Sequence, residues 1–355
     1  MGEQSFVLWL DKISKDEPFV AGKKCGHLGE MQRAGLPVPP GFALTLDAYE
    51  KFLRESGVEK EIAACLENNK ERLEKDTGVF EEISSYIMNE LILNKEMPPE
   101  LRELLENFYE ELCVECGVTD VPVAVRSSGP VSMPGQFDTY LNVCGKESLI
   151  YNIMKVWASS FNARAIAYRF QRDMKVESSP IGVAVLKMVN AKSSGVMFTL
   201  DPLNGDRSRI FIEGSWGLGE SLVSGSVTPD KYIVDKVAME IVDKTICTKT
   251  MELVYGENGD VVPRDVPQDK QDIPCLNDEE IMELAKLGKQ IEKHYGKPQD
   301  VEWAVDVDLE FPRNIIILQA RPETIWSKKQ EAPVMETKGN ATDIIARQLT
   351  QGIKF

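Results

Sequence analysis

Long apolar runs, a positive net charge and cysteines at metal-binding spacing are all missing from this sequence of 355 residues. No apolar run approaches the roughly 18 to 20 residues that a membrane-spanning helix requires. The N-terminus lacks the basic and apolar regions of a secretory signal. The net charge of −16 argues against nucleic acid or an anionic membrane as a partner. We therefore expect a globular cytoplasmic protein, whose length permits one to three domains.

Cysteine is present but forms no recognisable pattern. The seven cysteines are an odd number and are scattered along the chain, as expected of reduced thiols in the cytoplasm. Cys113 and Cys116 form one CxxC pair, without the second pair that zinc spacing requires. We therefore predict no metal site there.

Two apolar runs near the end of the sequence, 300–306 and 315–322, are interrupted by polar side chains. Both runs are rich in β-branched residues and a turn-forming segment separates them, so we predict a β-hairpin. Side chains two apart on a strand share a face. This places four polar side chains on one face and four apolar ones on the other: Asp300, Glu302, Gln319 and Arg321 against Val301, Trp303, Ile316 and Leu318.

The polar face of this hairpin needs a partner, because carboxylates and a guanidinium are costly to bury alone. A divalent metal ion and a polyphosphate would suit it, since carboxylate and amide oxygens bind Mg²⁺ and arginine binds phosphate. An internal salt bridge between Glu302 and Arg321 would also suit it, without any ligand. The hairpin alone leaves both interpretations open.

A second candidate anion site lies in the segment 21–31. Its small residues, followed by a helical pattern, predict a loop that leads into a helix N-terminus, where backbone N–H groups attract anions. Lys24 in this loop is a candidate for binding phosphate, although the spacing of a P-loop is absent. The alternative is that Lys24 is a solvated surface charge.

A third candidate follows the predicted buried strand 121–125. Arg126 comes directly after the strand, at the base of a loop of serine, glycine and proline residues that extends to Gly135. Such a loop offers hydroxyl and N–H groups that would fold over phosphates. The alternative is an ordinary surface loop, since these residue types are common in turns.

The other segments are predicted to be packing elements. The acidic segment 57–117 is helical in period, and 149–174 is predicted to be one long amphipathic helix. Strands are predicted over 181–189 and 193–201. A capping box at 277–280 starts a further helix.

In this order, these segments resemble the N-terminal nucleotide-binding domain of the phosphoenolpyruvate synthase and pyruvate phosphate dikinase family, over residues 16–326. The resemblance rests on these motifs: Ala21-Gly-Lys-Lys with Leu28-Gly-Glu-Met31, Ala34-Gly-Leu-Pro-Val-Pro-Pro-Gly41, Val125-Arg-Ser-Ser128, Ser194-Gly-Val-Met-Phe-Thr199, Gly217-Leu-Gly-Glu220, Asp300-Val-Glu-Trp-Ala304 and Leu318-Gln-Ala-Arg-Pro-Glu-Thr324. It implies an α/β, ATP-grasp-like fold with two lobes. The first lobe is 1–180, with the helical segment 57–117 inserted, and the second is 181–326. Residues 327–355 are expected to form a linker or tail that docks a partner.

The resemblance also implies a site for ATP and Mg²⁺. Lys24, Arg126 and Arg321 match the family's phosphate-contacting, catalytic residues, and Glu302 and Gln319 match its magnesium ligands. The segment 187–189 matches the strand between the lobes whose backbone meets adenine. The implied nucleotide-binding residues are Lys24, Arg126, Lys187, Met188, Val189, Thr199, Glu302, Gln319 and Arg321.

The sequence departs from the family at Lys23, where a second glycine is usual, and in the loop after Arg126, which is shorter than in the synthases. In the family, phosphate passes from ATP to a histidine on a separate domain. The sequence contains two histidines, His27 and His294, and neither lies in that histidine motif. The resemblance therefore implies an ATP-binding subunit that phosphorylates a histidine on a partner protein, with ATP converted to AMP and phosphate.

This split arrangement is similar to that of the phenylphosphate synthases, in which a larger subunit carries the histidine and the phenol site. Phenol is accordingly the expected final acceptor, by architectural analogy. A part of a phosphoenolpyruvate synthase-like or antibiotic phosphotransferase system is an alternative, as is a small-molecule kinase or ligase of the ATP-grasp type. A nucleotide-sensing subunit without turnover is a further alternative, which the complete set of charged ligands disfavours.

Overall fold

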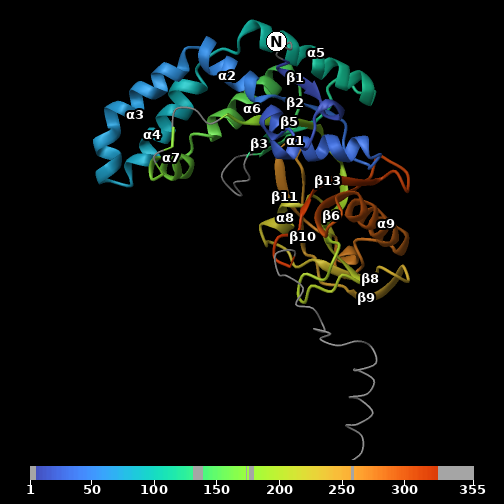
Figure 1. The fold of residues 1–355 in the computed structure, drawn as a ribbon. Coiled ribbons are helices and arrows are strands. Elements are labelled where there is room, and N and C mark those ends of the chain that lie inside the picture. The colour runs from blue at the N-terminus through green and yellow to red at the C-terminus, as the bar shows by residue number, and fades with distance from the viewer. Residues whose placement is uncertain (1–4, 131–138, 173, 176–179, 257–259, 327–355) are drawn as a thin grey trace, which may run out of the picture.

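A computed structural model describes residues 5–130, 139–172, 174–175, 180–256 and 260–326. They form a mixed helix and sheet structure in which a five-stranded and a six-stranded sheet lie one above the other (Figure 1). All paired strands in both sheets are antiparallel. Within the described ranges, no helix is long and apolar enough to cross a membrane.

The first sheet has the strand order β1-β2-β5-β3-β4. Its side chains alternate between two cores, since successive residues of a strand point to opposite faces. In β5, Val183 and Val185 join one buried cluster, whereas Ala184 and Leu186 join another. The strands are β1 (Val7–Trp9), β2 (Gly41–Leu44), β3 (Val123–Ser128), β4 (Thr139–Val143) and β5 (Gly182–Lys187).

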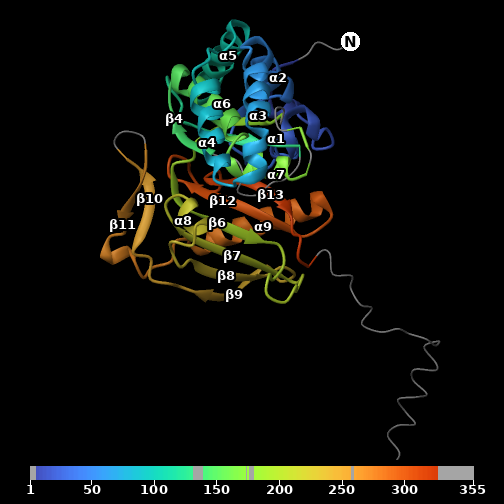
Figure 2. The same ribbon diagram turned by 90° about the vertical axis from the view of Figure 1, so that its left-hand side faces the viewer.

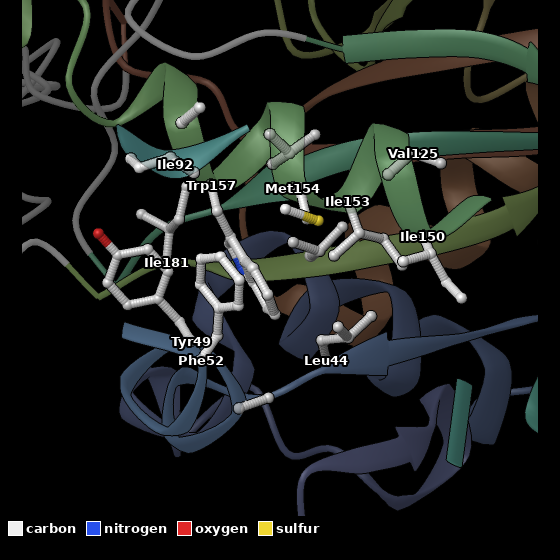
Figure 3. Close-up of a cluster of buried hydrophobic side chains, with 14 of the residues drawn as sticks. Leu44, Tyr49, Phe52, Ile92, Val125, Ile150, Ile153, Met154, Trp157 and Ile181 are labelled. Atoms are coloured by element: carbon white, nitrogen blue, oxygen red, sulfur yellow. The ribbon is translucent and has the colours of Figure 1, made fainter. Parts of the chain in front are cut away.

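Helices cover one face of this sheet and bury a large apolar cluster (Figure 3). In α6 the apolar positions recur three or four residues apart, which places Ile150, Ile153 and Trp157 together against the sheet. The Trp157 ring packs on Phe52 with a centroid distance of 5.1 Å. The helices of this layer are α2 (Leu46–Glu55), α3 (Val58–Lys75), α4 (Val79–Ser85), the π-helical turn η2 (Tyr86–Ile92), α5 (Pro99–Cys116), α6 (Lys146–Ser159) and α7 (Ala163–Phe170).

The prediction of one helix over 149–174 is wrong. The segment forms two helices, because Asn162 leaves helical geometry and caps α7. Its side chain accepts a hydrogen bond from the Ala165 N–H at 2.8 Å, which satisfies a donor at the start of the new helix.

The second sheet has the order β13-β12-β6-β7-β8-β9. It carries α9 on one face, and the Asn277–Glu280 capping box predicted at the start of α9 is confirmed. A two-stranded ribbon stands beside this sheet (Figure 2). The elements are β6 (Ala191–Phe198), β7 (Arg209–Trp216), α8 (Glu220–Val223), β8 (Asp230–Asp235), β9 (Glu240–Thr245), η3 (Gln268–Lys270), α9 (Asp278–Tyr295), β12 (Gln299–Asp306) and β13 (Ile315–Pro322), with the ribbon β10 (Met251–Tyr255) and β11 (Val261–Asp265).

The helix α1 (Pro18–Arg33), which follows the short turn η1 (Leu10–Lys12), connects the two halves. Its buried residues Cys25, Leu28 and Met31 belong to the same apolar cluster as Trp303 of the second sheet. The chain crosses from the first sheet to the second after β5, which pairs with β2 and β3. The division into lobes 1–180 and 181–326 stays a prediction, and β5, which it assigns to the second lobe, belongs to the first sheet.

Candidate functional site

A cavity of about 320 Å³ lies between the two sheets. Its walls are mainly apolar, and four charged residues also line it: Arg126, Lys187, Glu220 and Glu302. An apolar cavity with a few polar groups is typical of a small-molecule binding site. The principal lining residues are Ala124, Arg126, Leu186, Lys187, Met188, Val189, Ser194, Gly195, Val196, Leu218, Glu220, Glu302, Ala304 and Leu318.

Arg126 reaches the cavity because β3 alternates: Val123 and Val125 face the helical core, whereas Ala124 and Arg126 face the second sheet. One guanidinium nitrogen, Nη2, lies 3.4 Å from Glu302 Oε2. The Arg126 Nε is buried and has no hydrogen-bond partner among the described residues. A buried donor without a partner is costly, so this guanidinium is suited to a further anionic acceptor.

The predicted hairpin is confirmed as β12 paired with β13. Asp300 lies opposite Arg321, and Glu302 lies opposite Gln319. The Arg321 guanidinium contacts Asp300 Oδ2 at 2.7 and 2.8 Å. Burial raises the pKa of the Asp300 carboxyl, and Arg321 opposes that shift.

The alternative of an internal salt bridge between Glu302 and Arg321 is wrong. Arg321 lies directly opposite Asp300 and forms its ion pair with that residue. Glu302 pairs instead with Arg126 of the other sheet. The charged face of the hairpin therefore joins the two sheets.

The predicted apolar face of the hairpin is partly wrong. A β-bulge between Glu302 and Trp303 shifts the register. As a result, three successive residues of β13, Leu318 to Ala320, line the larger cavity or a smaller one beside Lys24. Leu318 lines both cavities and Gln319 lines the smaller one. Ile316 packs with Val189 and Ala304 beside Leu318, rather than with Val301 and Trp303 as predicted: the clusters are Val189, Ala304 and Ile316 on one side, and Val301, Trp303, Ile317 and Ala320 on the other.

Lys24 lies at a kink in α1. Residues Ala21 and Gly22 are not helical, and a Cβ on Gly22 would lie 2.0 Å from the Ser128 carbonyl oxygen, so the helix and the strand that carries Arg126 meet closely. The Cys25 N–H donates to Ser128 Oγ at 3.1 Å, which joins the two segments. This geometry requires a residue without a side chain at position 22.

A smaller cavity is lined by Lys24, Arg126, Leu318 and Gln319, together with His27. The pKa of Lys24 is lowered, first by burial and then by Arg126, while Glu302 opposes the shift. Lys24 is partly buried in this cluster of cations, which argues against a solvated surface charge.

Of the other predicted residues, some line the larger cavity and one does not. The segment Lys187 to Val189 lines the larger cavity, as a backbone wall for a bound ring would. Thr199 is fully buried, lies at neither cavity and accepts a hydrogen bond from the Gln299 N–H at 2.8 Å. Most of the predicted loop after Arg126 falls in 131–138, outside the described residues.

Two residues of the cavity wall are not among the predicted site residues. Glu220, at the start of α8, and Ser194 on β6 both line the cavity. Both stand in motifs that carry the family resemblance, Gly217 to Glu220 and Ser194 to Thr199, but neither side chain was singled out there. The motifs could therefore have indicated these two residues. The sequence did not show that their side chains face the cavity.

Glu302 and Gln319 fit the ligand types expected of Mg²⁺, since a carboxylate and an amide stand at directly opposite positions of the hairpin. Glu302 lines the larger cavity and Gln319 the smaller one. Magnesium in nucleotide sites is bound through one or two carboxylates together with substrate phosphates. Among the described residues there is no group of three or more His, Cys, Asp or Glu side chains arranged for a metal. One carboxylate and one amide would suit a magnesium ion that substrate phosphates also bind.

Comparison with known proteins gives a match over residues 19–342 to the family described as pyruvate phosphate dikinase, AMP/ATP-binding domain. The probable phosphoenolpyruvate synthase of Staphylothermus marinus is 42% identical over 95% of this chain and 43% of that protein. That of Methanocaldococcus jannaschii is 43% identical over 98% of this chain and 29% of that protein. The phosphoenolpyruvate synthase of Aeropyrum pernix is 39% identical over 93% of this chain and 43% of its own length. The chain thus spans less than half the length of these relatives.

Among solved structures, D-alanyl-alanine synthetase A from Vibrio cholerae aligns with 72% of this chain and 56% of its own. The TM-score is 0.27 and the sequence identity is 10%.

Proposed function

This chain belongs to the pyruvate phosphate dikinase AMP/ATP-binding domain family, and we propose that it is the ATP-handling part of a phosphotransferase. One observation carries the proposal: Arg126 from the first sheet and Glu302 from the second meet at 3.4 Å beside Lys24, at the edge of an aliphatic cavity. The two halves would act as the lobes of an ATP-grasp-like fold. A nucleotide between them would contact both.

In the proposed complex the purine occupies the larger cavity, against the backbone of Lys187 to Val189. The phosphates extend toward Arg126 and Lys24, with Arg321 at the exposed end of the hairpin. Glu302 and Gln319 would hold Mg²⁺, which would neutralise phosphate charge and orient the phosphates when bound.

The residues of this chain would act by position and charge, as phosphoryl transfer requires. Arg126 and Lys24 supply fixed positive charge where negative charge builds in the transition state. The Arg126 Nε, which has no partner among the described residues, would donate to a phosphate oxygen. Asp300 holds Arg321 on the same face as Glu302 and Gln319.

The proposed overall reaction converts ATP and water into AMP and phosphate and leaves one phosphoryl group on a histidine. We propose that this histidine lies outside residues 1–355, on a partner protein or a further domain. His294 contacts Glu30 at 2.8 Å, and His27 lies at the smaller cavity. Neither matches the motif that carries the family's phosphorylated histidine.

Phenol, as in the phenylphosphate synthases, and a reaction that makes phosphoenolpyruvate are the two proposed destinations of the phosphoryl group. The names of the similar proteins support the second. The first rests on the resemblance to the phenylphosphate synthases alone. Both use the same ATP site, so the residues discussed above do not discriminate between them. Product analysis with phenol or pyruvate as acceptor would do so.

The test is nucleotide product analysis with Mg-ATP, for the chain alone and with its histidine-carrying partner. We expect AMP, phosphate and an acid-labile phosphoprotein when the partner is present. Arg126→Ala should lower this turnover at least 100-fold, since removal of one transition-state donor costs about that much. Arg72→Ala is the matched control, because Arg72 is an exposed arginine on α3 that contacts Glu82 and Asn69.

Three other outcomes would contradict the proposal. ATP that binds but is never consumed, with or without the partner, would indicate a nucleotide sensor. Turnover by the isolated chain with a small acceptor would indicate a self-contained kinase or ligase. Normal turnover by Arg126→Ala would remove Arg126 from the site.

A further inference from the structure

The segment Met188 to Asn190 joins the two sheets and forms part of the cavity wall. Its hydrogen bonds go to both sides. The Met188 N–H donates to the Pro122 carbonyl at 2.8 Å, and the Val307 N–H donates to the Asn190 carbonyl at 2.9 Å. Val189 lies between these two attachments, and its side chain packs against Ala304, which also lines the cavity. The position of Val189 therefore helps to set the shape of the cavity.

The ribbon β10–β11 approaches this segment from outside the six-stranded sheet (Figure 2). It is attached close to the cavity, where the Leu218 N–H donates to the Leu253 carbonyl at 2.9 Å. A Cβ on Gly217 would lie 2.4 Å from the same carbonyl, and Gly217 has a φ of +72°, so this close approach requires glycine. Because Leu218 lines the cavity, the ribbon is in direct contact with its wall.

We propose that Tyr255, at the end of β10, is a positioning residue for the purine end of the nucleotide site. Its hydroxyl donates to the Val189 carbonyl at 3.1 Å, which ties the connecting segment to the ribbon. This hydrogen bond fixes the Val189 peptide and holds its side chain against Ala304. The inference rests on the proposed function, since it takes the larger cavity to be the purine site.

The chemistry of the contact suits a lasting hydrogen bond. Tyr255 is partly buried, and burial together with the nearby Asp306 raises the pKa of its hydroxyl, so the group stays a donor at neutral pH. A carbonyl that has one donor in place is held in one orientation, which reduces the ordering required when a ligand binds. Tyr255 is not among the described residues that line the cavity, so it would act through Val189.

The test compares Tyr255→Phe with the wild type and with Tyr151→Phe, a matched change at an exposed tyrosine on α6. Two ligands are titrated by calorimetry: Mg-ATP, and inorganic tripolyphosphate with Mg²⁺, which has no purine. We expect Tyr255→Phe to weaken ATP binding roughly fivefold, as one hydrogen bond is worth. Tripolyphosphate binding should stay unchanged, which also shows that the fold is intact. Tyr151→Phe should change neither.

The outcomes separate this inference from the proposed function. Equal ATP affinities for Tyr255→Phe and the wild type would overturn the role of Tyr255 and leave the function standing. An equal loss of affinity for both ligands would also overturn it, because a general structural defect would have that effect. A wild-type chain that binds tripolyphosphate but not ATP, or neither ligand, would overturn the proposed function itself.

Discussion

Two ion pairs in this molecule differ in how completely their charges are satisfied. Lys249 and Asp230, in the second half, lie 2.7 Å apart and are both fully buried. Both Asp230 oxygens are saturated: one accepts from Lys249 and the Cys247 N–H, the other from Tyr232 and the Cys275 N–H. Arg126 and Glu302 are 3.4 Å apart, and their side chains are 20% and 30% exposed. The Arg126 Nε has no hydrogen-bond partner among the residues that the structure describes.

This difference separates a structural pair from one suited to a ligand. A buried pair whose hydrogen bonds are complete has no capacity to bind another group. The Lys249–Asp230 pair instead attaches the chain on both sides of the β10–β11 ribbon to β8. A looser pair at the edge of a cavity keeps donor capacity for an anion. Satisfaction of hydrogen bonds therefore distinguishes the two better than charge or burial alone.

The largest expected effect is on stability. Lys249→Met should lower the free energy of unfolding by about 3 to 5 kcal/mol, because it leaves the Asp230 carboxylate buried without a counter-charge. Chemical denaturation monitored by circular dichroism measures this change. The double change Lys249→Met with Asp230→Asn should recover part of the loss, since the uncompensated charge is gone. A loss below about 1 kcal/mol for the single change would mean that the closed pair does not stabilise the fold.

The next effect concerns ligand-linked stability. Arg126→Met should change the stability of the free protein by no more than about 1 kcal/mol, as for a partly solvated pair. ATP at 100 times its dissociation constant stabilises a protein that binds it by about 2.7 kcal/mol, and the variant should lose most of this at the same ATP concentration. Thermal melting with and without Mg-ATP gives both values. A variant that loses stability without ligand, yet keeps the full ATP effect, would place Arg126 with Lys249 as a structural residue.

The sequence predicted the parts of this comparison that depend on local pattern. The period-two pattern of 300–306 and 315–322 was enough to place the hairpin, and the apolar run before Arg126 was enough to place a strand. The prediction that Arg126 follows this strand is wrong, because β3 continues through Arg126 to Ser128 and pairs with β5 over its whole length. The bulge at Glu302 was not predictable, because it depends on how β13 packs, and it reverses the side on which Leu318 lies. The Lys249–Asp230 pair and the Tyr255 contact join residues far apart in the chain, and no local pattern marks either one.

A smaller effect is expected at the metal ligands. Glu302→Gln keeps a hydrogen-bond acceptor beside Arg126 but removes the carboxylate that Mg²⁺ prefers. The Mg²⁺ concentration needed to tighten ATP binding should rise about tenfold, on the scale of other metal-site changes. Calorimetric ATP titrations at graded Mg²⁺ concentrations measure this shift. Glu310→Gln, in the exposed turn of the same hairpin, is the control and should not change the Mg²⁺ requirement. An equal Mg²⁺ requirement for Glu302→Gln and the wild type would argue that Glu302 only pairs with Arg126.

The smallest effect is expected for a cluster of charged side chains around Glu30. Glu30 on α1 contacts Lys15 at 2.9 Å, Arg33 at 3.0 Å and His294 of α9 at 2.8 Å, so it links the two halves at the surface. Its hydrogen bond with Lys15 is the main cause that lowers the pKa of Glu30 from 4.5 to about 2. A lowered pKa in the folded state means that the stabilisation is present above pH 4.5 and is lost as the pH falls toward 2.

Glu30→Gln should therefore reduce the free energy of unfolding by about 1 kcal/mol or less at pH 6, and this difference should shrink between pH 4.5 and 3. Urea denaturation across this range, with Glu59→Gln on the exposed start of α3 as control, measures it. A difference that stays constant with pH would show that Glu30 contributes through packing, and the charge of Glu30 would then carry no stability of its own.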